Sequence, residues 1–501
     1  MKNIIGLAFC LVLILHVFSC TDLEENPKGL LAPEGFFKTP EDVNAAIYGA
    51  YAEWVTTQVE KEYFLSLMLR SDMVDVGDRN TAGDRIAIND FRMDPSNNMI
   101  RQSWNRLYQA ISAANTAIAA SRQIDADESV KKELEAKARF LRAFTYFHLV
   151  RYFGDVPYMD SPVESAEVLD AITRTSEEEI YENIIADLVF AKENLPIQYN
   201  PEQRNVGSKG SAATALSEVY LTLYRYEEAA AEARYVIQNA DEFGYRLEQD
   251  FQDLFNANVA GTLKEPIFTY ELKNTLGSGA YNQADGMINL TRIRDLAPRS
   301  LSVNVPSLKV YETWDDRDYR KSVSFEDTVL IDGNLIHITD ANIRVPRPHI
   351  AKYFRFPGPQ EGGDDRSSDH RYSLYRYADV LLFAAEAIAE SEGATPEAIG
   401  YVNQIRERAR FNGVQATDFP ADVELSISNE QFKEVVREER RLEFAFEFKR
   451  WYDIKRWGIL EQVFTGSTSL ESHEVNTTRD YLFPIPQTEI DVTDFEQNPG
   501  Y

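Results

Sequence analysis

The sequence predicts a mainly α-helical protein in which tetratricopeptide-like helical pairs carry long irregular loops and a few short strands. Two observations predict this class. Several segments place apolar residues at the 3.6-residue spacing of an amphipathic helix, and a long stretch between them loses that spacing and gains Gly and Pro. The composition is ordinary for a globular protein, because 44% of the 501 residues are hydrophobic and 27% are charged.

The helices can be taken in chain order. The first strong pattern covers Lys132–Tyr152, and Gly154 with the nearby Pro157 predicts its end. The next begins near Ser176, where Glu179 completes a capping box, and ends at Pro196. Residues 212–223 and 229–237 form two apolar stripes separated by a short break, which is typical of one tetratricopeptide unit. Three further helices are predicted over 377–388, 396–410 and 432–446.

Two stretches lack the helical spacing. The longer one runs from Gly261 to Asp369 and is rich in Gly and Pro, with strand-like pieces at Pro266–Leu272 and Thr328–Ile338. The shorter one runs from Asp75 to Asn98. Long loops on a helical scaffold commonly carry function, so a ligand is expected at these stretches.

The N-terminus has the features of a bacterial lipoprotein signal. Lys2 precedes an apolar run from Ile4 to Phe18, which is too short to span a membrane and fits a secretory signal. Cys20 follows directly, and it is the residue that would be acylated after removal of residues 1–19. Phe18 is bulkier than is usual at its position, and the alternative is an ordinary signal peptide with an incidental cysteine. The other cysteine, Cys10, lies inside the signal, so no disulfide or cysteine nucleophile is expected in the body of the protein.

The charge balance excludes one class of partner. The chain has 81 acidic and 52 basic side chains, a formal net charge of −29. Such a surface repels phosphate backbones, so nucleic acid is not expected as a partner.

Short motifs recur in order along the whole chain. The N-terminal half contains Cys20–Glu24, Phe37–Asp42, Gly49–Tyr51, Trp104–Tyr108, Leu141–Ala143 and YFGDVP at 152–157. The C-terminal half contains RYADVLL at 376–382, RWYDIKRWG at 450–458, LFPIP at 482–486 and QNPGY at 497–501. Each motif alone is weak, but their order and spacing together are specific. In this combination the chain resembles the SusD/RagB family of nutrient-binding outer-membrane lipoproteins of Bacteroidetes.

The resemblance implies an ellipsoidal helical domain with a loop-rich face that binds oligosaccharide. It also implies a lipid-anchored protein that faces the cell exterior and passes glycans to a TonB-dependent (SusC-like) outer-membrane transporter, without catalysis. We therefore expect a signal peptide over 1–19, a lipidated tether over 20–35 and one SusD-like domain over 36–501. Within that domain we expect an N-terminal helical part over 36–260 and a loop-rich middle and C-terminal part over 261–501.

A search for catalytic motifs agrees with a binding role. The sequence has no His-Glu-x-x-His, no Gly-rich phosphate loop and no Gly-x-Ser-x-Gly, and its six histidines are scattered. We expect no catalytic residue, no metal and no cofactor. Carboxylates are abundant, so a glycosidase pair is not excluded by counting, although nothing singles two of them out.

Aromatic platforms and planar hydrogen-bonding groups are what glycan binding requires. Four of the five tryptophans (Trp54, Trp104, Trp451 and Trp457) lie in helices or motifs where core packing is expected. Trp314, at the edge of the irregular middle, is a candidate platform, with a structural role equally open. Tyr281 is a second candidate, because it lies in the flexible run Gly279–Asn282 beside the amide of Asn282.

The first irregular stretch offers polar candidates. Asp72, Arg79, Asp84, Arg85 and Phe91 lie in or near it, and Arg and Asp can each bridge two neighbouring hydroxyls. The alternative for most of these residues is a solvated charged loop.

Two other classes of function stay open. One is a tetratricopeptide scaffold that binds only protein, and the other is a surface glycoside hydrolase. The sequence does not identify the glycan, since loops of this kind vary freely; the enzymes encoded by neighbouring genes would reveal its linkage.

Overall fold

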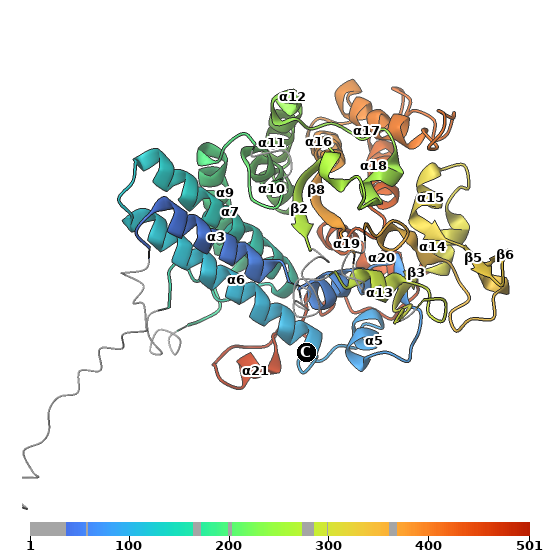
Figure 1. Ribbon diagram of the computed structural model, residues 1–501, viewed down its shortest axis with the longest axis horizontal. Helices are drawn as coiled ribbons and strands as arrows, with labels where there is room; N and C mark the ends of the chain where they lie inside the picture. Colours follow the sequence, from blue (N-terminus) through green and yellow to red (C-terminus); the bar gives the residue numbers. More distant parts are fainter. Residues whose placement is uncertain are drawn as a thin grey trace, which may run out of the picture. The chain divides into compact units, whose positions relative to one another are not determined.

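The computed structural model describes residues 37–56, 59–163, 172–198, 203–272, 285–297, 299–359 and 368–501. Cys20, Tyr281 and Asn282 lie outside these ranges. The described chain from Thr39 to Tyr501 forms one unit, and its mainly helical character confirms the predicted fold class (Figure 1).

The longer helices are α3 (Pro40–Trp54), α6 (Asn98–Gln123), α7 (Glu128–Phe153), α9 (Glu177–Asn194), α10 (Lys209–Thr222), α11 (Tyr226–Gln238), α16 (Tyr377–Ser391), α17 (Pro396–Ala409), α18 (Asn429–Glu443) and α19 (Arg450–Trp457). The shorter helices are α4 (Leu65–Leu69), α5 (Gly83–Asn89), α12 (Ala240–Phe243), α13 (Met287–Thr291), α14 (Leu308–Thr313), α15 (Tyr319–Ser324), α20 (Leu460–Phe464) and α21 (Gln487–Ile490). Single turns of other helix types are η1 (Val59–Phe64), η2 (Phe251–Phe255), η3 (Ala260–Thr262), η5 (Ile338–Asp340) and η6 (Ala351–Tyr353).

The helices pack in sequence as neighbours. α3 packs on α6 and α7, α7 on α9, α9 on α10, and α10 on α11 (Figure 1). α11 then packs on α16, although more than a hundred residues separate them in the chain, and α16 packs on α17 and α18. The predicted pair 212–223 and 229–237 is α10 and α11, so the tetratricopeptide-like pairing is present.

Local signals set several helix ends. The Thr39 hydroxyl accepts the N–H of Asp42 at the start of α3, where Pro40 occupies the first turn. Ser176 caps α9 in the same way through the N–H of Glu179, as predicted. α7 ends at Gly154, whose φ of 76° favours glycine. The helix predicted to reach residue 446 ends earlier, at Glu443, because Phe446 adopts a positive φ of 67°.

The strands form two-stranded antiparallel sheets that join distant parts of the chain. The pairs are β1 (Val74–Val76) with β3 (Asn304–Pro306), β2 (Pro266–Glu271) with β8 (Arg371–Arg376), β4 (Phe325–Glu326) with β7 (His349–Ile350), and β5 (Thr328–Ile331) with β6 (Asn334–His337). The strand-like piece predicted over Thr328–Ile338 is therefore a hairpin, because the chain turns at Asp332 and Gly333, both with positive φ.

The core surrounds α7, which is buried on nearly all sides from Leu134 to Phe153. Trp54, Phe64 and Phe144 meet there with edge-to-face ring contacts. His148 stacks on Trp54, and its Nδ1 lies 2.7 Å from the hydroxyl of Tyr63. His148 thus has the structural role expected of a histidine in a dense helix.

Residues 480–501 pack against the N-terminal part of the chain. Phe483 donates its N–H to the carbonyl of Tyr152, and the two rings stack with centroids 3.6 Å apart. Asn498 donates to the carbonyls of Phe153 and Phe483, both at 2.8 Å. Arg70 of the N-terminal part pairs with Asp480 at 3.1 Å, and both are buried.

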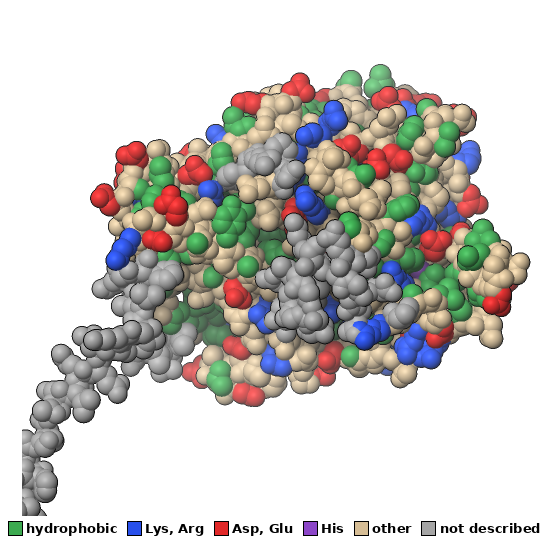
Figure 2. Space-filling model, viewed as in Figure 1, with side chains coloured by type: hydrophobic (Ala, Val, Ile, Leu, Met, Phe, Trp, Pro, Cys, Tyr) green, Lys and Arg blue, Asp and Glu red, His purple; other side chains and the backbone are tan. Residues whose placement is uncertain are grey.

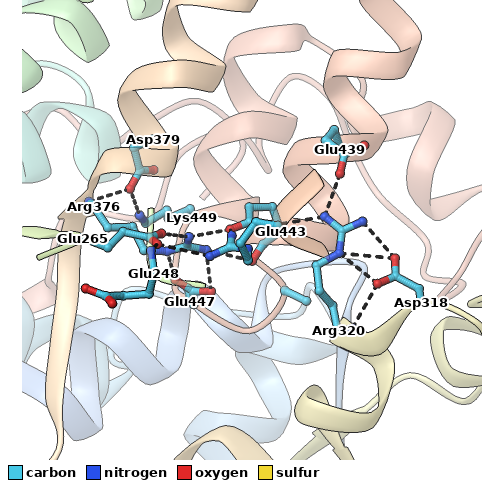
Figure 3. A network of polar contacts seen from close by, with 12 residues as sticks. Glu248, Glu265, Asp318, Arg320, Arg376, Asp379, Glu439, Glu443, Glu447 and Lys449 are labelled. Carbon is cyan, nitrogen blue, oxygen red and sulfur yellow. Dashed lines mark hydrogen bonds and ion pairs between the residues drawn. The ribbon is translucent and has the colours of Figure 1, made fainter. Parts of the chain in front are cut away.

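A buried network of charges ties β2, β8, α15, α17 and α18 together (Figure 3). Arg376, at the end of β8, binds Glu265 at 2.6 Å, Glu447 at 3.0 Å and the carboxylate of Glu443. Glu443 also binds Arg408 and Arg320. These three arginines hold the pKa of Glu443 far below its usual value, although burial alone would raise it.

Candidate functional site

The two irregular stretches meet at the β1·β3 pair. β1 opens the stretch that leads to α5, and β3 lies in the middle of the chain, with Val74 opposite Pro306. Beyond β1, the N–H groups of Gly77 and Asp78 continue the pairing to the carbonyls of Val303 and Ser302. A Cβ at Gly77 would lie 2.5 Å from the Ser302 carbonyl oxygen, so only glycine permits this approach. The fold therefore brings together the loops that the sequence indicated separately.

Carboxylates and guanidinium groups alternate across this junction. Asp78 is bound by Arg294 and, at 3.4 Å, by Arg344. Asp75 accepts a hydrogen bond from Arg347 at 3.0 Å. We use the name loop face for the surface formed by these and neighbouring charged residues: Asp75, Asp78, Arg79, Arg85, Asp90, Arg92, Arg294, Arg344 and Arg347. Figure 2 shows Lys and Arg side chains near α5, at the lower right of the view.

Arg79, one of the residues proposed from the sequence, lies on this face. Its side chain is 49% exposed and donates to Asp90 at 2.6 Å. Arg92, 73% exposed, binds the same carboxylate. Partial burial would raise the pKa of Asp90, but the hydrogen bonds from the two arginines hold it below its usual value. One carboxylate thus orients two guanidinium groups that remain open to solvent.

Arg85 also lies here, half-buried at the start of α5. Its guanidinium donates to the hydroxyl of Thr81 at 3.0 Å. Burial lowers the pKa of Arg85, while Glu62 and Asp84 act in the opposite direction. Asp84 is itself half-buried, in the first turn of α5.

The predictions for Asp72 and Phe91 are corrected by their burial. Asp72 is 1% exposed, and both of its carboxylate oxygens bind Arg450 at 2.7 Å, so the carboxylate faces the protein and not a ligand. Phe91 is 1% exposed: Arg70 covers its ring at 3.7 Å, and Phe464 contacts it edge-on. Both residues hold the loop to the C-terminal segment, which the sequence alone does not reveal.

Trp314 takes the structural role that was left open. It is 3% exposed and packs edge-on against Phe325, with ring centroids 5.4 Å apart. Trp54, Trp104 and Trp451 are buried as expected. Trp457 is half-buried and donates its indole N–H to Glu386 at 2.8 Å.

Sequence reasoning missed Arg294, Arg344 and Arg347. The sequence did offer one signal for these arginines: they lie in the Gly- and Pro-rich middle of the chain. A charged residue in such a loop is not expected to support a core, so it is available for binding. What the sequence could not give was their partners, because Asp75 and Asp78 lie more than two hundred residues earlier in the chain.

The chemistry available on the loop face is binding. Guanidinium and carboxylate groups held in fixed orientations can each bridge two neighbouring hydroxyls. Within the described ranges, no group of three or more His, Cys, Asp or Glu side chains is placed to hold a metal ion. Among the helices described, none is both long and apolar enough to cross a membrane.

Comparison with known proteins identifies the family. Residues 341–501 match the SusD family model, and residues 23–221 match a SusD-like model described as "Starch-binding associating with outer membrane". SusD-like protein P2 of Formosa agariphila is 44% identical over 98% of both chains. A SusD-like protein of Bacteroides ovatus is 23% identical over 73% of this chain and 67% of its own. The chain belongs to the SusD-like family.

Solved structures share the fold. A SusD homologue from Bacteroides thetaiotaomicron superposes with a TM-score of 0.81 at 22% identity, over 94% of this chain and 98% of its own. A laminarin-binding SusD-like protein gives 0.76 at 22% identity, over 93% and 100%. Surface glycan-binding protein A of B. thetaiotaomicron, solved with laminarihexaose, gives 0.76 at 20% identity, over 91% and 99%.

Proposed function

We propose that this protein is a lipid-anchored surface glycan-binding protein, which captures oligosaccharides at the outer membrane and delivers them to a TonB-dependent transporter without cleaving them. The observation that carries the proposal is its family membership, since 44% identity extends over the whole length of a SusD-like relative. The description of a matching family model as starch-binding, and of a solved structure of the same fold as laminarin-binding, supports carbohydrate as the ligand class.

On this proposal the loop face is the glycan site. Arg79 and Arg85 contribute from the first stretch, and Arg294 and Arg344 from the middle. Tyr281 and Asn282, which precede the described α13 (Met287–Thr291), are proposed as the aromatic platform and its neighbouring amide. Affinity should be weak, with a dissociation constant of about 1 μM to 1 mM, because each sugar hydroxyl exchanges a water hydrogen bond for a protein one at a net gain of about 1 kcal/mol.

The test uses soluble protein lacking residues 1–20 in affinity gels that contain laminarin, starch or other polysaccharides. We expect retention by at least one glycan and no release of reducing ends. Tyr281→Ala, and Arg79→Ala combined with Arg344→Ala, should each weaken binding about fivefold, which corresponds to ~1 kcal/mol. Arg234→Ala is the control, because Arg234 also pairs with carboxylates at the surface but lies on α11.

The outcomes separate the remaining functional classes. Reducing ends released from any glycan would favour the surface hydrolase. Flat titrations against the whole panel, together with affinity for the transporter, would favour the protein-binding scaffold. Loop-face variants that bind like the parent would move the site elsewhere.

The proposed anchor is the acylated Cys20. Two or three acyl chains at about 0.8 kcal/mol per buried CH₂ anchor a protein stably, whereas one chain does so marginally. Cys20→Ser should therefore release the full-length protein from the outer-membrane fraction and abolish its labelling by radioactive palmitate. A variant that stays in that fraction through repeated salt washes would show that lipidation is not the anchor.

A further inference from the structure

A groove of about 610 Å³ lies between the end of α11, α12 and α17, away from the loop face. In Figure 1, α12 and α17 flank α16 along the upper edge of the view. Three other cavities lined by described residues measure about 40, 20 and 10 Å³, room for a few water molecules at most. Ligand sites typically have about 300–1,000 Å³, so this groove has the size of a binding site.

The floor of the groove is buried, and its wall is aromatic. Tyr245 and Tyr377 line the floor and are only 6% and 8% exposed. Arg408 lines it too, and its guanidinium is bound to Glu265 at 3.1 Å and to Glu443, although its Nε has no partner among the described residues. Phe411 forms a wall and bridges to Ala416. Because Phe411 is only half-buried, its ring offers surface of the kind that sugar rings cover.

The rim differs from the surface around it. Gln238, Gln249, Gln404, Arg246 and Glu407 line the groove and are exposed. Within the described part of the chain, none of these five side chains makes a hydrogen bond or an ion pair. By contrast, Arg234 on the same α11 binds two carboxylates, and Arg410 just beyond α17 binds Asp422. These two arginines near the groove are thus paired, whereas the polar side chains of its rim remain available to bind a ligand.

The unpaired groups define the chemistry of the ligand. A glutamine amide presents a donor and an acceptor in one plane, which matches a pair of neighbouring hydroxyls. The free charges are one guanidinium, Arg246, against the carboxylates of Glu407 and Asp241, so the rim carries a small negative excess. That excess repels sulfated and uronic sugars.

We propose that this groove is a second carbohydrate site, which takes one or two neutral sugar units packed against the ring of Phe411 and held by the glutamine rim. The inference rests on the proposed function for its ligand class, but it uses none of the loop-face residues. A second site would let the protein contact one polysaccharide at two places, or two polysaccharide chains at once. Binding at both sites would hold the protein on a polysaccharide more strongly than either site alone.

A site-specific reporter tests the groove alone. The sequence has cysteine only at Cys10 and Cys20, so soluble protein lacking residues 1–20 contains none. Ala416→Cys, at the exposed edge of the groove, can therefore carry a single environment-sensitive fluorophore. Laminarihexaose and maltohexaose are the neutral probes, and trigalacturonate is the acidic one.

We expect a saturable fluorescence change with at least one neutral probe and at least tenfold weaker binding of trigalacturonate. Gln404→Ala and Phe411→Ala should each weaken this response at least fivefold. Gln415→Ala is the matched control, because Gln415 lies in the same turn as Phe411, is exposed and does not line the groove.

Two outcomes would overturn the second site and leave the proposed function standing. In one, the parent protein is retained by glycans in gels but shows no fluorescence response. In the other, it is retained and responds, but Gln404→Ala and Phe411→Ala leave the response intact. Tighter binding of trigalacturonate than of the neutral probes would overturn the assigned ligand. Absence of both gel retention and fluorescence response would overturn the proposed function and the second site together. Circular dichroism of each variant establishes that the comparison is made between folded proteins.

Discussion

Glu60 is a fully buried carboxyl group whose protonation is linked to folding. It accepts the N–H groups of Gly286 at 2.7 Å and Met287 at 2.9 Å, and the hydroxyl of Tyr372 at 3.1 Å. Burial first, and then the neighbouring Asp285, raise the pKa of Glu60 well above its usual value. The hydroxyls of Tyr270 and Tyr353 also lie near Glu60, and the buried His370 lies near Asp285.

The sign of the pH dependence follows from this shift. The unfolded chain loses the Glu60 proton near pH 4.3, whereas the folded chain keeps it to higher pH. The stability that the protonated group contributes is therefore complete below about pH 4 and is lost as pH rises through the folded pKa. Glu60→Gln, which cannot ionise, should flatten this decline. Urea unfolding between pH 5 and pH 8 measures the unfolding free energy as a function of pH. The control is Glu53→Gln, because Glu53 is half-exposed. If the unfolding free energies of the parent and of Glu60→Gln fall in parallel with pH, the assignment to Glu60 is wrong.

The helices and strands around Arg376 are joined by charge as well as by apolar packing. Arg376 ends β8, Glu265 precedes β2, and Glu443 ends α18, so one guanidinium fixes three elements (Figure 3). Removing one partner of such a buried set leaves the others unpaired at low dielectric, which is far more costly than losing an exposed pair.

Arg376→Met should therefore lower the free energy of unfolding by about 3–5 kcal/mol. The same change at Arg234, which also binds two carboxylates but at the surface, should cost no more than about 1 kcal/mol. Chemical denaturation of both variants at pH 7 gives the comparison. Equal losses for the two variants would mean that the buried network contributes no more to stability than a surface pair. Arg376→Lys keeps the charge but loses the bidentate guanidinium geometry, so its loss of unfolding free energy should lie between those of Arg376→Met and Arg234→Met.

At the scale of the whole molecule, the sequence predicts those features that are determined by residues close together in the chain, such as helix periods and helix ends. The periods of 212–223 and 229–237, the Ser176 cap and the Gly154 stop all lie within a few residues of what they determine, and the corresponding helices are present. Pairings across a hundred residues or more carry no such local signal. Hence the loop face was anticipated as two separate stretches, while the burial of Asp72, Phe91 and Trp314, and the arginines that reach Asp75 and Asp78, emerged only from the fold.

The packing of residues 480–501 on α7 and Arg70 has a consequence for the order in which the protein is made. Tyr152 and Phe153 complete their contacts only with Phe483 and Asn498, and Arg70 only with Asp480. Contacts that close loops of more than three hundred residues form late and slowly. A nascent chain therefore cannot complete the contacts of its N-terminal core until synthesis is almost over, so a chain cut short before Asp480 would lack the partners of Arg70, Tyr152 and Phe153.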